Sequence, residues 1–190
     1  PVLARLVRGG LPSVRKINLK GCSGHTGRIP DEIGNCAELR ALQLFENALE
    51  GPIPLVLLRW KFVEGRSIEL RGNAGLEIPA DISDIGDFSE LDLKGHNLRG
   101  PIPPIILRWK FMDKHTIDIS RNQALELPAD VGDMLDRVAV MDLSNHGLQG
   151  LIPLKLLQYK FVDDREILLN SNTGLVLPAD IGELGDGVSE

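Results

Sequence analysis

An eleven-residue stretch is written three times in this chain, and the repetition limits the folds that the chain can adopt. PIPLVLLRWKF at residues 52–62 returns as PIPPIILRWKF at 101–111 and as LIPLKLLQYKF at 151–161. A catalytic motif has no need of three copies, whereas a structural unit that stacks on itself does. We therefore expect a repeat protein, in which the repeat must be defined before single residues are assigned roles.

A shorter period lies within this one. An alternating apolar segment with a fixed tail reads LQLFENALEGPIP from residue 42, LDLKGHNLRGPIP from 91 and MDLSNHGLQGLIP from 141. A second version reads IELRGNAGLEIPADI from 68, IDISRNQALELPADV from 117 and ILLNSNTGLVLPADI from 167, and an imperfect copy starts at 17. Repeats thus start near 17, 42, 68, 91, 117, 141 and 167, a period of about 25 residues. The two versions alternate, so the building unit is a pair of repeats.

The pattern L-x-L-x-x-N-x-L over residues 17–190 resembles leucine-rich repeats, and the G-x-I-P that follows is similar to the plant-type subclass. The resemblance implies an α/β solenoid, a horseshoe or arc with a parallel β-sheet on its concave face and short helical, 3-10 or irregular return segments on its convex face. We predict one domain of seven repeats after a partial repeat at 1–16. The incomplete terminal repeats indicate a piece of a longer chain, and the alternation of two versions departs from a uniform plant-type array.

Polar residues recur at the point where each strand ends, five positions after the first apolar residue. In a short strand the two apolar residues of L-x-L face the same side, so stacked strands bury a common face. An asparagine amide can then satisfy backbone groups of the turning chain. The sequence predicts a structural ladder at this position: Cys22, Asn47, Asn73, His96, Asn122, His146 and Asn172. We interpret both histidines as ladder members, since two repeats separate them and they cannot share one metal.

The residues between the apolar positions point away from the core and form the surface best suited to a partner. Glu69, Asp92, Asp118 and Asp142 would form an acidic ladder, which packing alone does not favour because like charges in adjacent strands repel. We predict a partner-binding site on the concave face: Phe45, Glu69, Arg71, Asp92, Lys94, Asp118, Arg121 and Asp142. The alternative is that neighbouring cations offset the ladder and nothing binds.

Two features of the return segments have a structural and a functional interpretation. Trp60, Trp109 and Tyr159 would pack between repeats, with solvated cations around them, or would form a basic and aromatic band that contacts a partner. Apolar residues of the first copy, Phe62 and Val63 among them, fit one helical stripe. The aspartates of each P-A-D would cap helical turns, which we favour over a calcium site: Asp81, Asp130 and Asp180.

Composition and missing motifs exclude several function classes. The net charge of −6 argues against nucleic acid as the partner, and no apolar stretch reaches the roughly 20 residues of a membrane span. The sequence contains no nucleophile elbow, phosphate-binding loop or zinc motif, so we expect no enzyme, no catalytic residues, no cofactor and no metal. Cys22 and Cys36 are either reduced thiols or one disulfide.

The sequence therefore favours a non-enzymatic scaffold, a monomer that recognises a protein or peptide carrying basic groups. Two alternatives stay open: a sensor segment of a larger receptor kinase or Roco-type GTPase, and a structural protein that stacks through its ends. Few cysteines, no glycosylation sequon and no signal peptide slightly favour the cytoplasm, while the plant-type resemblance leaves an extracellular location open.

Overall fold

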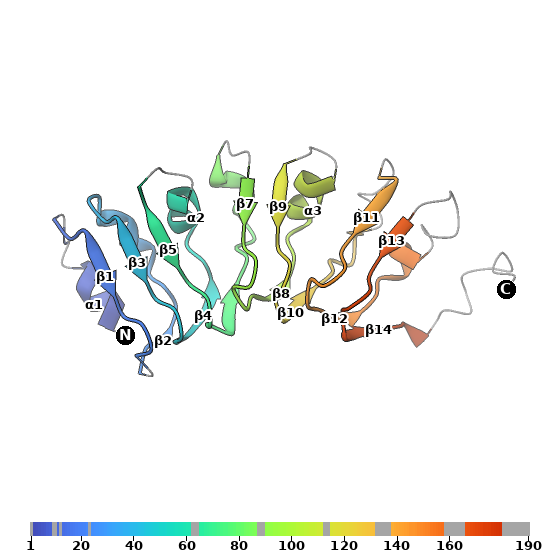
Figure 1. Ribbon diagram of the computed structural model, residues 1–190, viewed down its shortest axis with the longest axis horizontal. Coiled ribbons are helices and arrows are strands. Elements are labelled where there is room, and N and C mark those ends of the chain that lie inside the picture. Colours follow the sequence, from blue (N-terminus) through green and yellow to red (C-terminus); the bar gives the residue numbers. More distant parts are fainter. Residues whose placement is uncertain are drawn as a thin grey trace, which may run out of the picture. The chain divides into compact units, whose positions relative to one another are not determined.

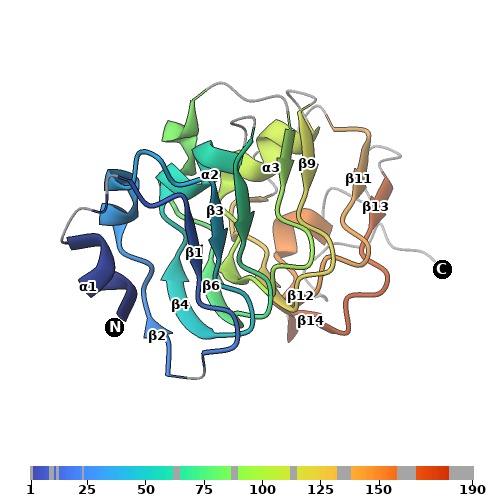
Figure 2. The same cartoon turned by 60° about the vertical axis from the view of Figure 1, so that its left-hand side comes forward.

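In the computed structural model (Figures 1 and 2), short parallel strands alternate with return segments along the chain. The structure describes residues 2–8, 11, 13–22, 24–61, 65–86, 90–111, 115–131, 138–157 and 166–179. Two compact units share the chain: the first comprises residues 1–88 and 95–99, and the second comprises 89–94 and 100–190.

The first unit repeats one order of elements: a three-residue strand, a second short strand and a helical return. Its elements are α1 (Val2–Arg8), β1 (Lys16–Asn18), β2 (Thr26–Gly27), the 3-10 helix η1 (Asp31–Asn35), β3 (Ala41–Gln43), β4 (Ala48–Pro52), α2 (Leu55–Lys61), β5 (Ser67–Glu69), β6 (Gly75–Glu77) and the 3-10 helix η2 (Ile82–Ile85). β1, β3 and β5 form one parallel sheet, and β2, β4 and β6 pair in parallel at the other end of each repeat. The return segments α1 and η1, η1 and α2, and α2 and η2 contact one another in turn.

The second unit follows the same order. Its elements are β7 (Glu90–Asp92), the end of β8 (Arg99–Pro101, of which Arg99 belongs to the first unit), α3 (Pro104–Phe111), β9 (Thr116–Asp118), β10 (Ala124–Glu126), β11 (Val140–Asp142), β12 (Leu148–Leu151), β13 (Glu166–Leu168) and β14 (Gly174–Val176). β7 pairs with β9 and β11 pairs with β13, while β10, β12 and β14 pair in that order.

The apolar residue that starts each repeat lies at the centre of its strand and points into the core. Ile17, Leu42 and Ile68 stand side by side in the sheet, and all three are buried. Leu44 and Leu70, two residues further along, are also buried, as the period of two along a strand requires. Stacking therefore buries a face that one strand could not bury alone. The predicted parallel sheet with short return segments is confirmed.

The return helix α2 uses its aromatic and basic residues for packing within the repeat and against the next one. Trp60 of α2 is only 8% exposed, and the Arg66 guanidinium lies 4.2 Å from its ring centroid. Arg59 Nε donates to Ile85 O at 3.2 Å, at the end of η2. The indole therefore packs as expected, but the neighbouring cations are not merely solvated, because they satisfy carbonyls and cover aromatic surface. The corresponding residues Phe62, Val63, Gln158, Tyr159 and Lys160 lie outside the described residues.

The predicted helix cap at Asp81 is wrong. Asp81 precedes η2, yet its side chain makes no capping hydrogen bond, and its φ of −87° and ψ of 20° differ from the extended geometry of a capping residue. The Asp81 carbonyl instead accepts the N–H of Asp84 at 2.9 Å, so the turn begins at Asp81 itself. Asp130 lies in a turn and is exposed, and Asp180 lies outside the described residues.

Gly147 marks the closest approach of two coils in the second unit. Its φ is +66°, a left-handed conformation that side chains disfavour, and a Cβ built there would lie 1.5 Å from Asn122 O. Gly147→Ala should therefore lower the free energy of unfolding by about 3 kcal/mol or more, because the backbone of residue 122 must move.

Urea denaturation of the G147A variant measures this cost. Gly95→Ala is the matched control, since Gly95 also has a positive φ of +63° but no atom within 4 Å of its Cβ position. Equal destabilisation of the two variants would attribute the effect to φ alone and contradict the close approach.

Candidate functional site

The ladder asparagines of the first unit join consecutive repeats. Asn73 is fully buried, and its Nδ2 donates to Leu44 O of the preceding repeat at 2.9 Å and to Leu70 O of its own repeat at 2.6 Å. Its Oδ1 accepts the N–H of Leu49 at 3.1 Å. Asn47 bonds in the same way to Leu19 O at 2.8 Å. Cys22, half-buried, offers only a weak thiol contact of 3.6 Å to Lys20 O.

The second unit repeats this arrangement. Asn122 Nδ2 donates to Leu93 O at 3.1 Å and Ile119 O at 2.7 Å, and Asn172 Nδ2 donates to Leu143 O and Leu169 O at 2.8 Å. Consecutive parallel strands bridged by a buried amide, at a spacing of about 25 residues, define one known architecture. The chain is built of leucine-rich repeats.

His146 holds a ladder position by a local contact. Its Nδ1 lies 2.6 Å from Ser144 O, and because a carbonyl only accepts, Nδ1 carries the proton. Burial lowers the pKa of His146, so the imidazole is neutral at pH 7. His96, at the ladder position of the repeat that starts at residue 91, is half-buried. No group of three or more metal-ligating side chains occurs within the described ranges.

The leucine-rich repeat strands of the second unit carry carboxylates on their outward side. Asp92 stands opposite Asp118 in the register of β7 and β9. Asp118 lies 40% exposed, with its Oδ2 3.4 Å from Lys94 Nζ. Three of the predicted partner-binding residues, Asp92, Lys94 and Asp118, are thus brought together. Asp142 occupies the same outward position on β11, and Arg121 is exposed at the turn after β9.

Each of these aspartates also caps its own turn. Asp92, Asp118 and Asp142 each accept, through Oδ1, the backbone N–H two residues ahead at 2.9 Å. In the first unit, Asn18 makes the same bond to the N–H of Lys20 at 3.1 Å. Since a neutral amide serves equally there, the turn requires an acceptor and not a charge. The carboxylate charge is therefore additional to what the turn needs.

The first unit carries mixed charge on and beside its strands. Glu69 accepts from Gln43 Nε2 at 3.4 Å and is the one acid among the outward residues of β1, β3 and β5. Lys16 and Lys20 flank Asn18, and Arg71 follows Glu69. The predicted acidic ladder therefore consists, in described contacts, of the second unit's aspartates, and a count of charge by unit would have revealed this.

Phe45 is covered rather than presented to a partner. Its ring lies 4.6 Å from Lys20 Nζ and 5.1 Å from Arg71 Cζ, measured to the ring centroid, and only 7% of the residue is exposed. The cations gain the attraction of the ring quadrupole while their stems shield it from water. Lys20 also lies 3.9 Å from a Glu46 carboxylate oxygen.

A cavity of about 400 Å³ opens in the second unit beside Asp142. It is lined by Lys110, Phe111, His115, Thr116, Ile117, Asp142, Ser144 and His146. Lys110 Nζ reaches from α3 to Ile117 O at 2.8 Å. Burial lowers the pKa of Lys110, while the charges of Asp118 and Asp142 oppose that effect. The sequence indicated this residue only as the recurring lysine of the RWKF stretch.

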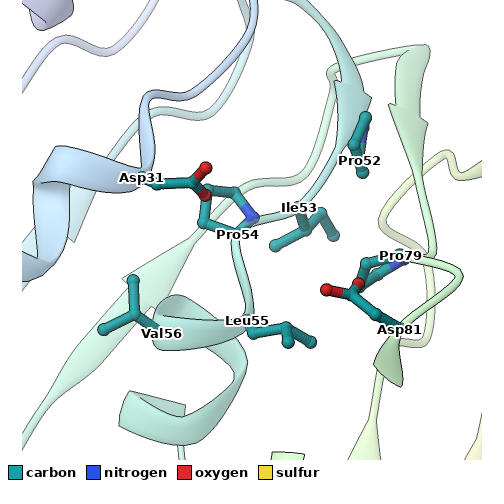
Figure 3. A pocket seen from close by; sticks show the side chains of 8 residues that line it. All are labelled: Asp31, Pro52, Ile53, Pro54, Leu55, Val56, Pro79 and Asp81. Atoms are coloured by element: carbon teal, nitrogen blue, oxygen red, sulfur yellow. The ribbon is translucent and has the colours of Figure 1, made fainter. Parts of the chain in front are cut away.

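A second cavity, of about 390 Å³, lies among the return segments of the first unit (Figure 3). Figure 3 shows Asp31 on the left and Asp81 on the right, with Ile53 between them and Leu55 below. Both aspartates are exposed. This cavity has no buried polar group, so its chemistry is less defined than that beside Asp142.

Comparisons with known proteins find similarity among solved structures. No family model and no curated protein matches the chain. Among solved structures, a plant ice-binding protein is 23% identical over 90% of this chain and 53% of its own, with a TM-score of 0.46. The PEPR1–AtPEP1 structure is 26% identical over 90% and 23%, with a TM-score of 0.46. Pollen Receptor Kinase 3 is 24% identical over 89% and 79%, with a TM-score of 0.41. The chain spans about half the length of the first and about a quarter of the second.

None of the described helices is long and apolar enough to cross a membrane.

Removing the amide of Asn73 should destabilise the first unit. Asn73→Ala removes the amide partner of the Leu70 carbonyl and the Leu49 N–H in the core and one of the two amide bonds to Leu44 O, at a cost of about 2–4 kcal/mol. Urea denaturation measures the loss. Asn18→Ala removes one bond at an exposed turn and is the control; an equal cost for both variants would contradict the ladder.

The lowered pKa values of Asp118 and Asp142 predict that the protein loses stability in acid. Burial raises the pKa of Asp118, but the Ser120 hydrogen bonds and Lys94 outweigh it; the Ser144 hydrogen bonds lower that of Asp142. Because both folded-state pKa values lie below the unfolded value of about 3.9, this stability is complete above pH 4 and lost as pH falls through the folded pKa. Chemical denaturation at pH 5 and pH 3 should show a larger loss for the wild type than for D118N/D142N. Equal losses would contradict the pKa directions.

Proposed function

We propose that this leucine-rich repeat protein recognises a protein or peptide partner and has no catalytic activity of its own. The partner contacts the outward side of the strands in the second unit and brings basic groups. The observation that carries the proposal is the surplus charge of Asp92, Asp118 and Asp142. Their turns need an acceptor only, and like charges on neighbouring strands repel, so the charge exceeds what the turns require and is available to a partner.

The remaining outward residues of these strands support a positively charged partner. Glu90 and Glu166 begin β7 and β13 with further acidic side chains, and Lys94 is the one cation at the outward positions of the described strands in this unit. Val140, which begins β11, is a large apolar residue that is 51% exposed. An acidic surface with an exposed apolar residue suits a basic segment with an apolar side chain. Of the other predicted contacts, Arg121 fits the rim of this surface.

The first unit has a different part in this proposal. Its outward cations Lys16, Lys20 and Arg71 repel a basic segment, and Phe45 beneath them has little exposed area. We therefore assign basic-partner recognition to the second unit, and Glu69, Arg71 and Phe45 serve packing within the first.

The test replaces the charge and keeps the turn. D92N/D118N/D142N retains the Oδ1 acceptor, as Asn18 does naturally, so folding should change by about 1 kcal/mol or less. Binding of a fluorescein-labelled hexalysine peptide at low salt should weaken about tenfold or more, because three charges facing the ligand are lost. Fluorescence anisotropy measures the affinity, and circular dichroism confirms the fold.

A matched control separates the site from the net charge. E32Q/E38Q/D84N removes three exposed carboxylates from the return segments of the first unit, with the same change in net charge. It should leave the affinity within about twofold of the wild type. If both triple variants lose affinity equally, hexalysine senses net charge and the proposed site is wrong.

A further inference from the structure

The strands of the second unit pair two by two, and one boundary between them is left unpaired. β7 pairs with β9 and β11 pairs with β13, but no strand pairing joins β9 to β11 among the described residues. Figures 1 and 2 both show β11 beside β13 and apart from β9.

The pairing pattern shows which backbone groups face this boundary. Leu93 N–H donates to Asp118 O at 2.8 Å, so the even-numbered residues of β9 bond toward β7. In a parallel strand the residues in between bond toward the other side, which assigns the amide groups of Ile117 and Ile119 to the boundary. Likewise Leu143 N–H donates to Leu168 O at 2.9 Å, so the amide groups of Val140 and Asp142 face β9.

Both edges contribute to the lining of the cavity of about 400 Å³, β9 through Ile117 and β11 through Asp142. In this lining the backbone acceptor Ile117 O accepts from Lys110 Nζ at 2.8 Å. His146 forms a buried wall, 5% exposed, and its Nε2 has no hydrogen-bond partner in the described structure. Thr116 and Ser144 add hydroxyl groups at the mouth.

The cavity closes toward the turns and is open toward the strands. Arg121 N–H donates to Asn145 O at 2.9 Å, and Gly147 lies tightly against Asn122. On the strand side of these turns, the edges of β9 and β11 face each other with alternating backbone donors and acceptors that do not bond to one another. Paired strands lie about 4.8 Å apart, so an inserted strand needs roughly 10 Å between its neighbours. A segment of two or three extended residues matches the length of β9 and β11.

We propose that the cleft between β9 and β11 binds a short extended peptide, whose main chain pairs with the unpaired edges of both strands. Backbone pairing supplies the affinity, and Val140, Thr116 and Ser144 contact alternate side chains. A strand N–H that bonds Ile117 O displaces the Lys110 ammonium, which protects this edge in the unbound chain as lysines commonly do. The inference deepens the proposed function by locating a peptide, but it does not depend on basic charge.

The probe is chosen so that the two proposals can fail separately. It is an acetylated and amidated pentapeptide with the sequence of residues 116–120, Thr-Ile-Asp-Ile-Ser, which alternates apolar and polar residues and carries one negative charge. The acidic strand surface repels such a peptide, so its binding reports the cleft, while hexalysine reports the acidic surface. Amide hydrogen exchange by NMR is the measurement.

Saturating peptide should slow exchange of the Ile117, Ile119 and Asp142 amides roughly tenfold or more, since pairing removes them from water. The same peptide with alternate N-methylated amides should give no protection. Thr116→Trp, which fills the mouth of the cleft, should abolish binding. Ser67→Trp, at the corresponding exposed position of β5, should leave binding unchanged.

Three results would overturn the inference. They are no protection at millimolar peptide, equal protection by the N-methylated peptide, and equal loss of binding in T116W and S67W. If D92N/D118N/D142N still binds the pentapeptide but not hexalysine, both proposals are supported. If the triple variant still binds hexalysine, the proposed acidic site is wrong, and the pentapeptide result alone decides on the cleft.

Discussion

A side-chain amide buried between repeats is the interaction on which the rest of this structure depends. A chain that turns after only three strand residues leaves backbone donors and acceptors inside the core, where an unpaired group is costly. Asn73 and Asn172 satisfy two carbonyls and at least one N–H each, and they link a repeat to the one before it. Every outward residue of the strands is held in place by that stacking.

The alternation of two repeat versions has a physical consequence at the strand boundaries of the second unit. Strands of one pair bond to each other, while at the boundary after β9 Lys110 from the return helix donates to the carbonyl of Ile117 on β9. The lysine of the recurring RWKF stretch thus takes the place of a strand N–H. A feature that looked like a surface motif is part of how repeats join, and it leaves a cavity where regular pairing would leave none.

The sequence could predict the architecture because its signals are periodic. The strand centres, the asparagine positions and the parallel sheet follow from L-x-L-x-x-N spacing in seven copies. The cap at Asp81 was wrong because spacing from Pro-Ala does not fix φ and ψ. The aspartates of the second unit could be found as an outward column, but not their second role, since an Asx turn depends on side-chain rotamers. The cleft could not be predicted, because unpaired edges are a property of strand contacts and not of composition.

The central claim, that ladder amides satisfy the backbone groups of the turns and join consecutive repeats there, is tested most directly by native-state hydrogen exchange of the wild-type chain. The N–H groups of Leu49 and Leu148 donate to the side chains of Asn73 and Asn172 at 3.1 and 3.0 Å. We expect both amides to exchange as slowly as Leu44 and Leu143, which donate to neighbouring strands, because all four open only with their unit. Exchange of Leu49 and Leu148 within minutes, while Leu44 and Leu143 stay protected, would contradict the account.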